Sequence, residues 1–228
     1  YQVRALEILC DDTIRRASLV MPRGFAKSTL SMLRIAHKVA YTPKGRKNYE
    51  IVISESQPQA LDYLQNLKDL VMHGDSFRKA FPWVEPGDRW GAHAAEFSTG
   101  VMVNCLGTNQ RVRGRNYKGL RPNITLDDFE SEENSSSAEE RRKLRRKIRA
   151  AWIPALRPRY GKFTAVGTLV HEDAYLNRIR KNKAWKRLSL RARRENGDPH
   201  PELYGEDGML WPDAHKDQDG NLVQFDLD

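Results

Sequence analysis

The sequence predicts an α/β fold in which an open, mostly parallel sheet is flanked by helices. Three observations lead to this fold class. Short apolar runs typical of buried strands alternate along the chain with longer segments of helical periodicity. A glycine-containing turn joins the first of these runs directly to the helix that follows it. The 228 residues are enough to bury a large core without a partner.

The expected elements follow one another in a strand-then-helix order. Apolar residues at helical spacing predict the helices, and short runs of branched or aromatic residues predict the strands. In chain order the expected elements are a helix over 2–16, a strand over 18–21, a helix over 27–39, a strand over 50–54, a helix over 59–72, paired strands over 96–106, a strand over 124–126, a helix over 135–152, a strand over 163–166 and a helix over 173–181.

The pattern weakens after this last helix. From residue 184 onward the chain becomes polar and rich in Gly, Pro and Asp, and no clear repeat is found anywhere. We therefore expect residues 1–183 to form the core domain and residues 184–228 to form a small lid or linker.

Composition restricts the class of partner. Lys and Arg number 39 against 30 Asp and Glu, giving a net charge of +9, which favours a polyanion such as nucleic acid. Cys10 and Cys105 lie far apart without CxxC spacing, which indicates a reduced intracellular protein without a thiol-based metal site. No apolar run approaches the roughly 20 residues of a membrane helix, and the first residues lack the apolar core of a signal peptide. We expect a soluble protein that does not bind membranes.

The segment Met21–Thr29 lies where a strand gives way to a helix, which is the context of a phosphate-binding loop. Lys27 would reach the β and γ phosphates of a nucleotide, and Ser28 would ligate Mg²⁺. The segment departs from the G-x-x-x-x-G-K-[ST] fingerprint because Met21 and Ala26 occupy the two glycine places. A basic turn that caps an ordinary helix is the alternative. The candidate nucleotide-binding residues of this loop are Pro22, Arg23, Gly24, Phe25, Ala26, Lys27, Ser28 and Thr29.

A second motif, Ile124–Glu130, brings carboxylates to the end of an apolar strand. Asp127 is the candidate for holding Mg²⁺ through water. The next acidic group would polarise the attacking water, and either Asp128 or Glu130 can serve, with Asp128 favoured slightly. The alternative is an acidic turn that caps the following helix. The two motifs occur in the order expected for an ATP-hydrolysing site. They lie about a hundred residues apart, each at the C-terminal end of a predicted strand.

Four segments resemble the large terminase subunit of tailed bacteriophages, the ATPase of viral DNA-packaging motors. The loop resembles the terminase form, in which an arginine four residues before the lysine touches the γ-phosphate, here Arg23. The most specific segment is 113–122, which is similar to the basic loop that leads into the family's acidic motif. Gly167 and Thr168 resemble its coupling motif. Tyr1 and Gln2 resemble the family's adenine-recognising pair.

The resemblance implies a P-loop NTPase fold of the ASCE type and an Mg²⁺-dependent ATPase that moves double-stranded viral DNA into a procapsid. It implies ATP and Mg²⁺ as cofactors. The partners it implies are the portal protein, the small terminase subunit and further copies of the chain in a pentameric ring. The location implied is the host cell cytoplasm, at the procapsid portal. Family members also carry a C-terminal nuclease, but the chain ends after the Leu210–Pro212 stretch that precedes it, and we expect no nuclease site here.

Two basic segments of the chain each allow two interpretations. One of Arg113, Arg115 and Arg121 would complete a neighbouring subunit's site as a trans-acting finger, or all three form a solvated loop. The run Arg141–Arg149 is either a solvated helix face or a grip on DNA phosphates.

Two rival functions stay open. A helicase-like or remodelling ATPase would carry a similar acidic motif, but it needs a second motor domain and further motifs that the sequence lacks. A non-enzymatic, basic nucleic-acid-binding module would hold no nucleotide at Lys27. Loss of nucleotide binding in Lys27→Ala would exclude the module.

Overall fold

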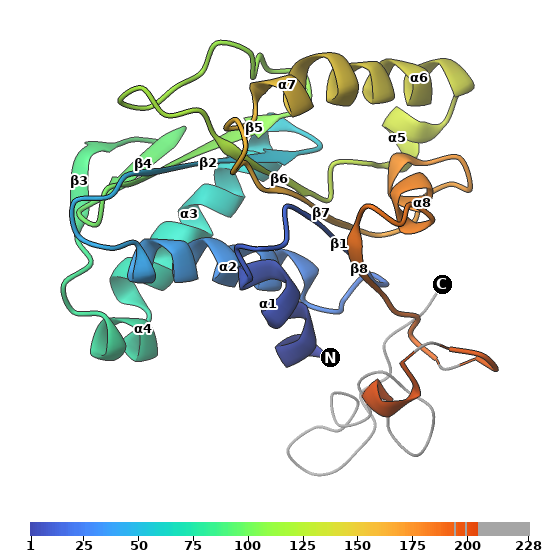
Figure 1. The fold of residues 1–228 in the computed structure, drawn as a ribbon, viewed down its shortest axis with the longest axis horizontal. Helices are drawn as coiled ribbons and strands as arrows, with labels where there is room; N and C mark the ends of the chain where they lie inside the picture. Colours follow the sequence, from blue (N-terminus) through green and yellow to red (C-terminus); the bar gives the residue numbers. More distant parts are fainter. Residues whose placement is uncertain (194, 199, 205–228) are drawn as a thin grey trace.

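The chain folds around one eight-stranded sheet, as the computed structural model shows (Figure 1). The structure describes residues 1–193, 195–198 and 200–204. Most of the predicted lid or linker, including the Leu210–Pro212 stretch, therefore lies outside the described residues. The strands are β1 (Arg16–Val20), β2 (Asn48–Ser54), β3 (Pro86–Trp90), β4 (Ala94–Phe97), β5 (Val101–Gly107), β6 (Asn123–Asp127), β7 (Phe163–Gly167) and β8 (Lys186–Ser189).

The strand order is β3-β4-β5-β2-β6-β7-β1-β8. All pairs from β5 to β8 are parallel, and only β3–β4 and β4–β5 are antiparallel. The mostly parallel sheet expected from the sequence is confirmed. Because parallel strands point the same way, the carboxyl ends of β5, β2, β6, β7, β1 and β8 share one edge of the sheet.

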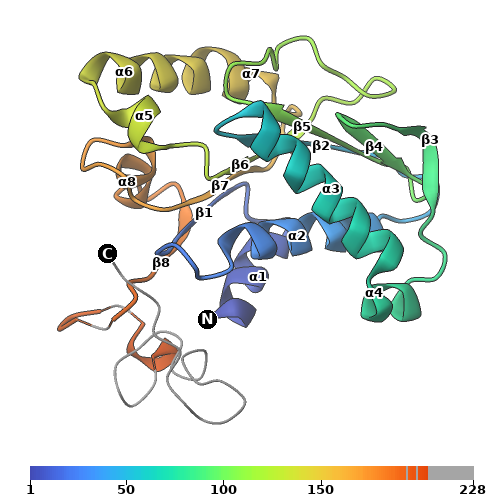
Figure 2. The same cartoon turned by 180° about the vertical axis from the view of Figure 1, so that it is seen from behind.

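Helices cover both faces of the sheet, which gives three layers (Figures 1 and 2). Helices α1 to α4 pack on one face, and α5 to α8 lie over the other, where the buried side chains of α6, η1 and α8 meet those of the central strands. The helices are α1 (Gln2–Cys10), α2 (Lys27–Tyr41), α3 (Gln57–His73), α4 (Asp75–Ala80), α5 (Glu132–Ser135), α6 (Ala138–Lys147), the π-helical turn η1 (Ile148–Trp152), α7 (Ile153–Ala155), α8 (Tyr175–Arg180) and the 3₁₀ turn η2 (Pro201–Leu203).

The two edge strands were not predicted. β3 begins with Pro86 and Gly87, and β8 is polar with Leu188 as its one fully buried residue. Edge strands tolerate such composition because one side of their backbone needs no partner. Since β8 pairs with β1, the sheet extends past the predicted boundary at residue 183.

Two predicted helices differ from the structure by more than a residue or two at their ends. The first ends at Cys10, where Asp11 Oδ1 accepts a 2.7 Å hydrogen bond from Thr13 N and turns the chain toward β1. The helix expected over 135–152 begins as α5 and α6, separated by a break at which the Ser137 hydroxyl caps α6. It then widens into the π turn η1.

A buried ion pair fastens α2 to the sheet. Arg34 of α2 donates from Nη1 and Nη2 to Glu50 Oε2 at 3.0 and 3.1 Å, and both side chains are 0% exposed. The other carboxylate oxygen of Glu50 accepts from Asn123 Nδ2 at 2.7 Å, and Thr125 Oγ1 accepts from Arg34 at 3.1 Å. This network joins α2, β2 and β6 at the centre of the molecule.

The structure also describes the apolar helices and the two cysteines of the chain. Within the described part of the chain, no helix combines the length and the apolar character needed to cross a bilayer. Cys10 and Cys105 are both free thiols. Burial raises the pKa of Cys105 well above the ordinary range, which makes it an unreactive packed thiol.

Candidate functional site

The carboxyl edge of the sheet gathers the predicted motifs. The lysine loop follows β1, Asp127 ends β6, and Gly167 ends β7. β7 lies between β1 and β6 and pairs with both strands. The lysine loop and the acidic motif are therefore one strand apart and face the same edge. Asp128 N donates to Val166 O at 3.0 Å, which continues the pairing of β6 and β7 beyond the sheet.

The turn between β1 and α2 contains two left-handed residues. Gly24 has φ 79° and Ala26 has φ 53°. Glycine adopts this conformation freely, whereas for alanine it costs roughly 1–2 kcal/mol. Ala26 stands at one of the glycine places of the fingerprint, so the substitution leaves a backbone that glycine would adopt without strain. Backbone strain of this kind is concentrated at functional sites.

Lys27 begins α2 and is almost completely buried. Its Nζ donates to Pro22 O at 2.6 Å, across the turn. Burial lowers the pKa of Lys27, and the charges of Asp128 and Asp127 oppose that fall. The ammonium group therefore lies within electrostatic reach of both carboxylates that end β6.

Asp127 is the buried carboxylate of the site, with 2% of the residue exposed. Burial, with a further contribution from Asp128, raises the pKa of Asp127 to about 7. The Ser28 and Ser31 hydroxyls and the Lys27 ammonium favour the charged form and oppose this rise. Asp127 Oδ1 is buried and has no hydrogen-bond partner, which is the costly state for a polar atom inside a protein.

These groups fit a magnesium ion. Within the residues the structure describes, no three His, Cys, Asp or Glu side chains gather into an all-protein metal site. Mg²⁺ commonly needs only one or two protein oxygens, with phosphate and water oxygens completing its octahedron. The unpartnered Oδ1 of Asp127 beside the Ser28 hydroxyl is a donor set of that kind.

Asp128 and Glu130 have different surroundings. Asp128 has φ 40°, and its Oδ1 lies beside Gly167, 3.3 Å from where a Cβ of that residue would stand. Glu130 is 7% exposed, and both of its oxygens are engaged: Oε1 accepts from Tyr175 N at 2.6 Å and Oε2 accepts from Leu176 N at 2.8 Å. Glu130 therefore caps the start of α8, and the geometry favours Asp128 as the group that can meet water.

Gly167 joins the site to α8. A Cβ at this position would lie 2.7 Å from Leu176 Cδ1 as well as close to Asp128 Oδ1, so only glycine fits without a shift. Thr168, the next residue, lines a cavity of about 610 Å³ beside the lysine loop, together with Met21 and Pro22. Lys27, Asp127 and Asp128 are not among the residues that line this cavity.

The other candidates of the lysine loop lie nearby. Arg23 is exposed, with its Nη2 4.0 Å from Glu132 Oε1. The Tyr1 ring stands 6.3 Å from the ring of Phe25, centroid to centroid, which brings the amino end of α1 to the loop. Gln2 follows Tyr1 and interacts with its hydroxyl. The structure thus places Tyr1 and Gln2 at the same edge as Lys27.

The three candidate finger arginines lie elsewhere. Arg113 donates to Ala150 O in η1, and Arg121 donates to Pro154 O at 2.5 Å in α7. Arg115 lowers the pKa of Tyr49, near the amino end of β2. None of these three contacts involves the lysine loop or the acidic motif of the same chain.

Sequence reasoning missed Ser31. Its Oγ lies 3.0 Å from Tyr63 OH, and it opposes the rise of the Asp127 pKa. The signal was available, since Ser31 follows Ser28 by three residues on one helix and therefore lies on the same face.

No protein-family model and no curated protein matches the chain. Among solved structures, the chain is similar to the large terminase ATPase domain of Thermus phage P74-26, with 16% identity and a TM-score of 0.48. The match covers 72% of this chain and 62% of that one, so it spans less than two thirds of the neighbour. A likeness at this level does not by itself assign a family, an activity or a partner.

Proposed function

We propose that this chain is an Mg²⁺-dependent ATPase of the P-loop kind, with ATP bound at the carboxyl edge of the sheet. The observation that carries the proposal is Asp127, a buried carboxylate with an unpartnered oxygen, adjacent to Ser28 and Lys27 on the first turn of α2. An unpaired buried carboxylate destabilises a fold unless a ligand compensates it. A cation held with a nucleotide would do so.

Each group of the site then has a role. The Lys27 ammonium would give up its hydrogen bond to Pro22 O and donate instead to the β and γ phosphate oxygens. Ser28 and Asp127 would hold Mg²⁺ directly or through water, and the bound ion would supply positive charge beside the phosphate oxygens. Arg23, exposed at the rim, would swing onto the γ-phosphate.

Asp128 is the proposed base. Its carboxylate would take a proton from the attacking water while the water oxygen forms a bond to the γ-phosphorus and the bond to the β–γ bridging oxygen breaks. Glu130 is assigned a different task, since both of its oxygens already accept backbone amides of α8. It would couple the acidic motif to α8 rather than meet water.

The work coupled to hydrolysis is proposed to be the packaging of double-stranded viral DNA through a procapsid portal. The support is the resemblance of the lysine loop, segment 113–122, the acidic motif and Gly167–Thr168 to large terminase subunits, together with the net charge of +9. On this proposal the portal protein, the small terminase subunit and further copies of the chain are partners, at the portal in the host cytoplasm. One of Arg113, Arg115 and Arg121 would then act on a neighbouring subunit.

Steady-state Mg²⁺-ATPase activity tests the enzymatic part. We expect the ATPase rate per molecule of wild-type protein to rise with protein concentration. Lys27→Ala and Asp128→Asn should each lower this rate by about 100-fold or more. Glu130→Gln should retain activity. Lys143→Ala is the matched control, because Lys143 pairs only with Glu139 and Glu140 of its own helix. A folded wild type that neither binds nor hydrolyses ATP would overturn the proposal.

Stimulation of that activity tests the packaging part. A terminase motor should respond to procapsids that carry a portal together with double-stranded DNA. A helicase-like enzyme should respond to single-stranded DNA alone, and that result would replace the packaging assignment while leaving the ATPase assignment intact.

A further inference from the structure

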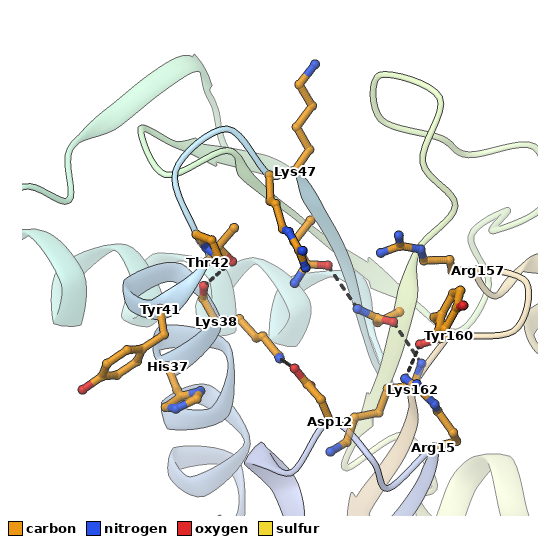
Figure 3. Close-up of a pocket in the computed structure, with 14 residues that line it drawn as sticks. Asp12, Arg15, His37, Lys38, Tyr41, Thr42, Lys47, Arg157, Tyr160 and Lys162 are labelled. Carbon is orange, nitrogen blue, oxygen red and sulfur yellow. Dashed lines mark hydrogen bonds and ion pairs between the residues drawn. The ribbon is translucent and has the colours of Figure 1, made fainter.

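A basic pocket lies at the amino edge of the sheet, opposite the candidate nucleotide site (Figure 3). It has a volume of about 480 Å³. Its walls come from the last turn of α2, from residues that precede β1, β2 and β7, and from Asn48 and Asn123, the first residues of β2 and β6. Its charged members are Asp12, Arg15, Lys38, Arg46, Lys47, Arg157 and Lys162.

Positive charge dominates this pocket. Its one carboxylate, Asp12, is already paired with Lys38. Lys162 is 3% exposed and donates to Leu9 O and Asp11 O, both at 2.6 Å, so it caps the end of α1 without any carboxylate. The pocket therefore holds several cationic groups in excess of its single paired acid.

Four of these cations are available to a ligand. Arg46 and Lys47 are exposed, and within the described residues their side chains form no ion pair or hydrogen bond. The Arg157 guanidinium lies 5.9 Å from the Tyr160 ring centroid, and within the described residues its side chain forms no ion pair or hydrogen bond. Arg15 lies 5.5 Å from the same centroid and donates to Tyr160 O at 2.8 Å. Tyr160 thus holds two guanidinium groups in place at one wall.

The cations are distributed along the rim. In Figure 3, Lys47 points away from the other labelled side chains, whereas Arg15, Arg157 and Tyr160 lie together on the other side of the pocket. Cations that converge on one point suit a single small anion, whereas cations spread over a rim suit successive phosphates of a chain. Guanidinium groups also match phosphate oxygens with two parallel hydrogen bonds.

We propose that this pocket binds the phosphodiester backbone of a nucleic acid without reading its sequence, through Arg15, Arg46, Lys47 and Arg157. The net charge of +9 favours such a polyanion over a short acidic ligand. The site goes beyond the proposed ATPase and does not depend on it, because the two sites occupy opposite edges of the sheet.

A second basic surface on the molecule is the rival. Arg142, Arg146 and Arg149 are exposed and lie at helical spacing on α6 and η1. Their neighbours Arg141 and Arg145 form ion pairs with Asp173, just before α8, and so help to pack α6 against α8. The stripe is carried on the outer surface of a helix, whereas the amino-edge pocket is concave and surrounds its ligand from several elements.

Fluorescence anisotropy with a labelled 20-base-pair DNA duplex, without nucleotide and over a range of salt concentrations, tests the proposal. In Arg46→Ala/Lys47→Ala we expect about tenfold weaker binding and a salt slope shallower by about two, since two phosphate contacts are lost. Lys181→Ala/Lys183→Ala, which removes the same charge from another exposed surface, should stay within about twofold of the wild type. Lys27→Ala should bind DNA as the wild type does, which separates this result from the fate of the ATPase proposal.

Two outcomes would overturn the proposal. The first is unchanged DNA affinity in the pocket variant together with weaker binding in Arg142→Ala/Arg146→Ala, which would move the contact to α6. The second is an Arg46→Ala/Lys47→Ala variant that loses inorganic phosphate binding, measured by calorimetry, but keeps the DNA affinity of the wild type. That result would make the pocket a site for a small anion.

Discussion

Two of the buried carboxylates in this sheet, Glu50 and Asp127, have different surroundings. Glu50, in the middle of the sheet, is satisfied by Arg34 and Asn123, with donor distances between 2.7 and 3.1 Å. Asp127, at the carboxyl edge, has an unpartnered oxygen, and burial raises its pKa to about 7. Both oxygens of the first carboxylate are engaged by the protein, whereas Oδ1 of the second has no hydrogen-bond partner.

The difference separates a structural charge from a candidate ligand site. The Arg34–Glu50 pair holds α2 against β2 and β6, and so fixes the direction in which α2 presents Lys27 and Ser28. Around Asp127 the backbone is strained instead, with left-handed Ala26 and Asp128. Sites that bind a ligand commonly give up stability in this way.

The largest expected effect on stability comes from breaking the paired charge. Glu50→Leu leaves the Arg34 guanidinium buried without a counter-charge, and we expect a loss of about 3–5 kcal/mol in the free energy of unfolding. Urea denaturation followed by circular dichroism measures it. The double variant Arg34→Met/Glu50→Leu should recover most of the loss, because it removes both charges together. A single variant within 1 kcal/mol of the wild type, roughly the value of an exposed pair, would contradict the pairing argument.

The next effect concerns catalysis at the unpaired edge. Asp128→Asn should lower kcat by about 10²–10³-fold, or roughly 3–4 kcal/mol in activation free energy, because the amide cannot accept the proton of water. Asparagine tolerates the left-handed backbone at this position, so the melting temperature should change little. Single-turnover hydrolysis measures the chemical step. Equal rates in the variant and the wild type would remove Asp128 from the role of base.

Glu130 offers the opposite combination. Glu130→Gln weakens two backbone hydrogen bonds at the start of α8, and we expect it to lose about 1–2 kcal/mol of stability. Its turnover at a temperature where the fold is intact should remain near that of the wild type. Thermal unfolding and steady-state assays of one preparation measure both quantities. A stable but inactive variant would restore Glu130 as a candidate base.

The smallest effect is a gain in stability. The folded state keeps the Asp127 proton up to about pH 7, whereas the unfolded chain releases it near the ordinary aspartate pKa of 3.8. The folded state therefore binds more protons between these values, and its stability falls as pH rises from about 4 to 7.

Asp127→Asn avoids this fall. At pH 8, without nucleotide or Mg²⁺, we expect its melting temperature to exceed that of the wild type by about 2–4 °C, equivalent to roughly 1 kcal/mol. At pH 5 the gain should shrink, because the wild-type carboxyl is then protonated. A gain that does not vary with pH would show that the charge of Asp127 is not its cause.

Much of the fold followed from local sequence patterns. Apolar runs such as Ile51–Ile53 predict the central strands, because a strand covered on both faces is apolar throughout. The edge strands gave no such signal, since β3 begins with proline and glycine and β8 alternates few apolar residues. The Arg34–Glu50 pair could not be inferred, because it joins a helix to a strand through the tertiary packing alone.

The candidate site was predicted in part. The residue types and order of the lysine loop and the acidic motif placed them at one edge, and the structure brings Lys27, Asp127 and Asp128 within electrostatic reach. The choice between Asp128 and Glu130 depended on where α8 begins, 45 residues farther along the chain. No local pattern contains that information. The roles assigned to Lys27, Ser28, Asp127 and Asp128 stay predictions. So do those of Arg23, Thr168, Tyr1 and Gln2.

The central claim is that ATP and Mg²⁺ compensate the unpaired charge of Asp127. Isothermal titration calorimetry with a non-hydrolysable ATP analogue, with and without Mg²⁺, tests it most directly. The account predicts tight binding by the wild type that requires Mg²⁺, a loss of about 100-fold or more in Lys27→Ala, and binding in Asp127→Asn that no longer responds to Mg²⁺. A folded wild type without measurable affinity, or a Lys27→Ala variant that binds equally well, would contradict it.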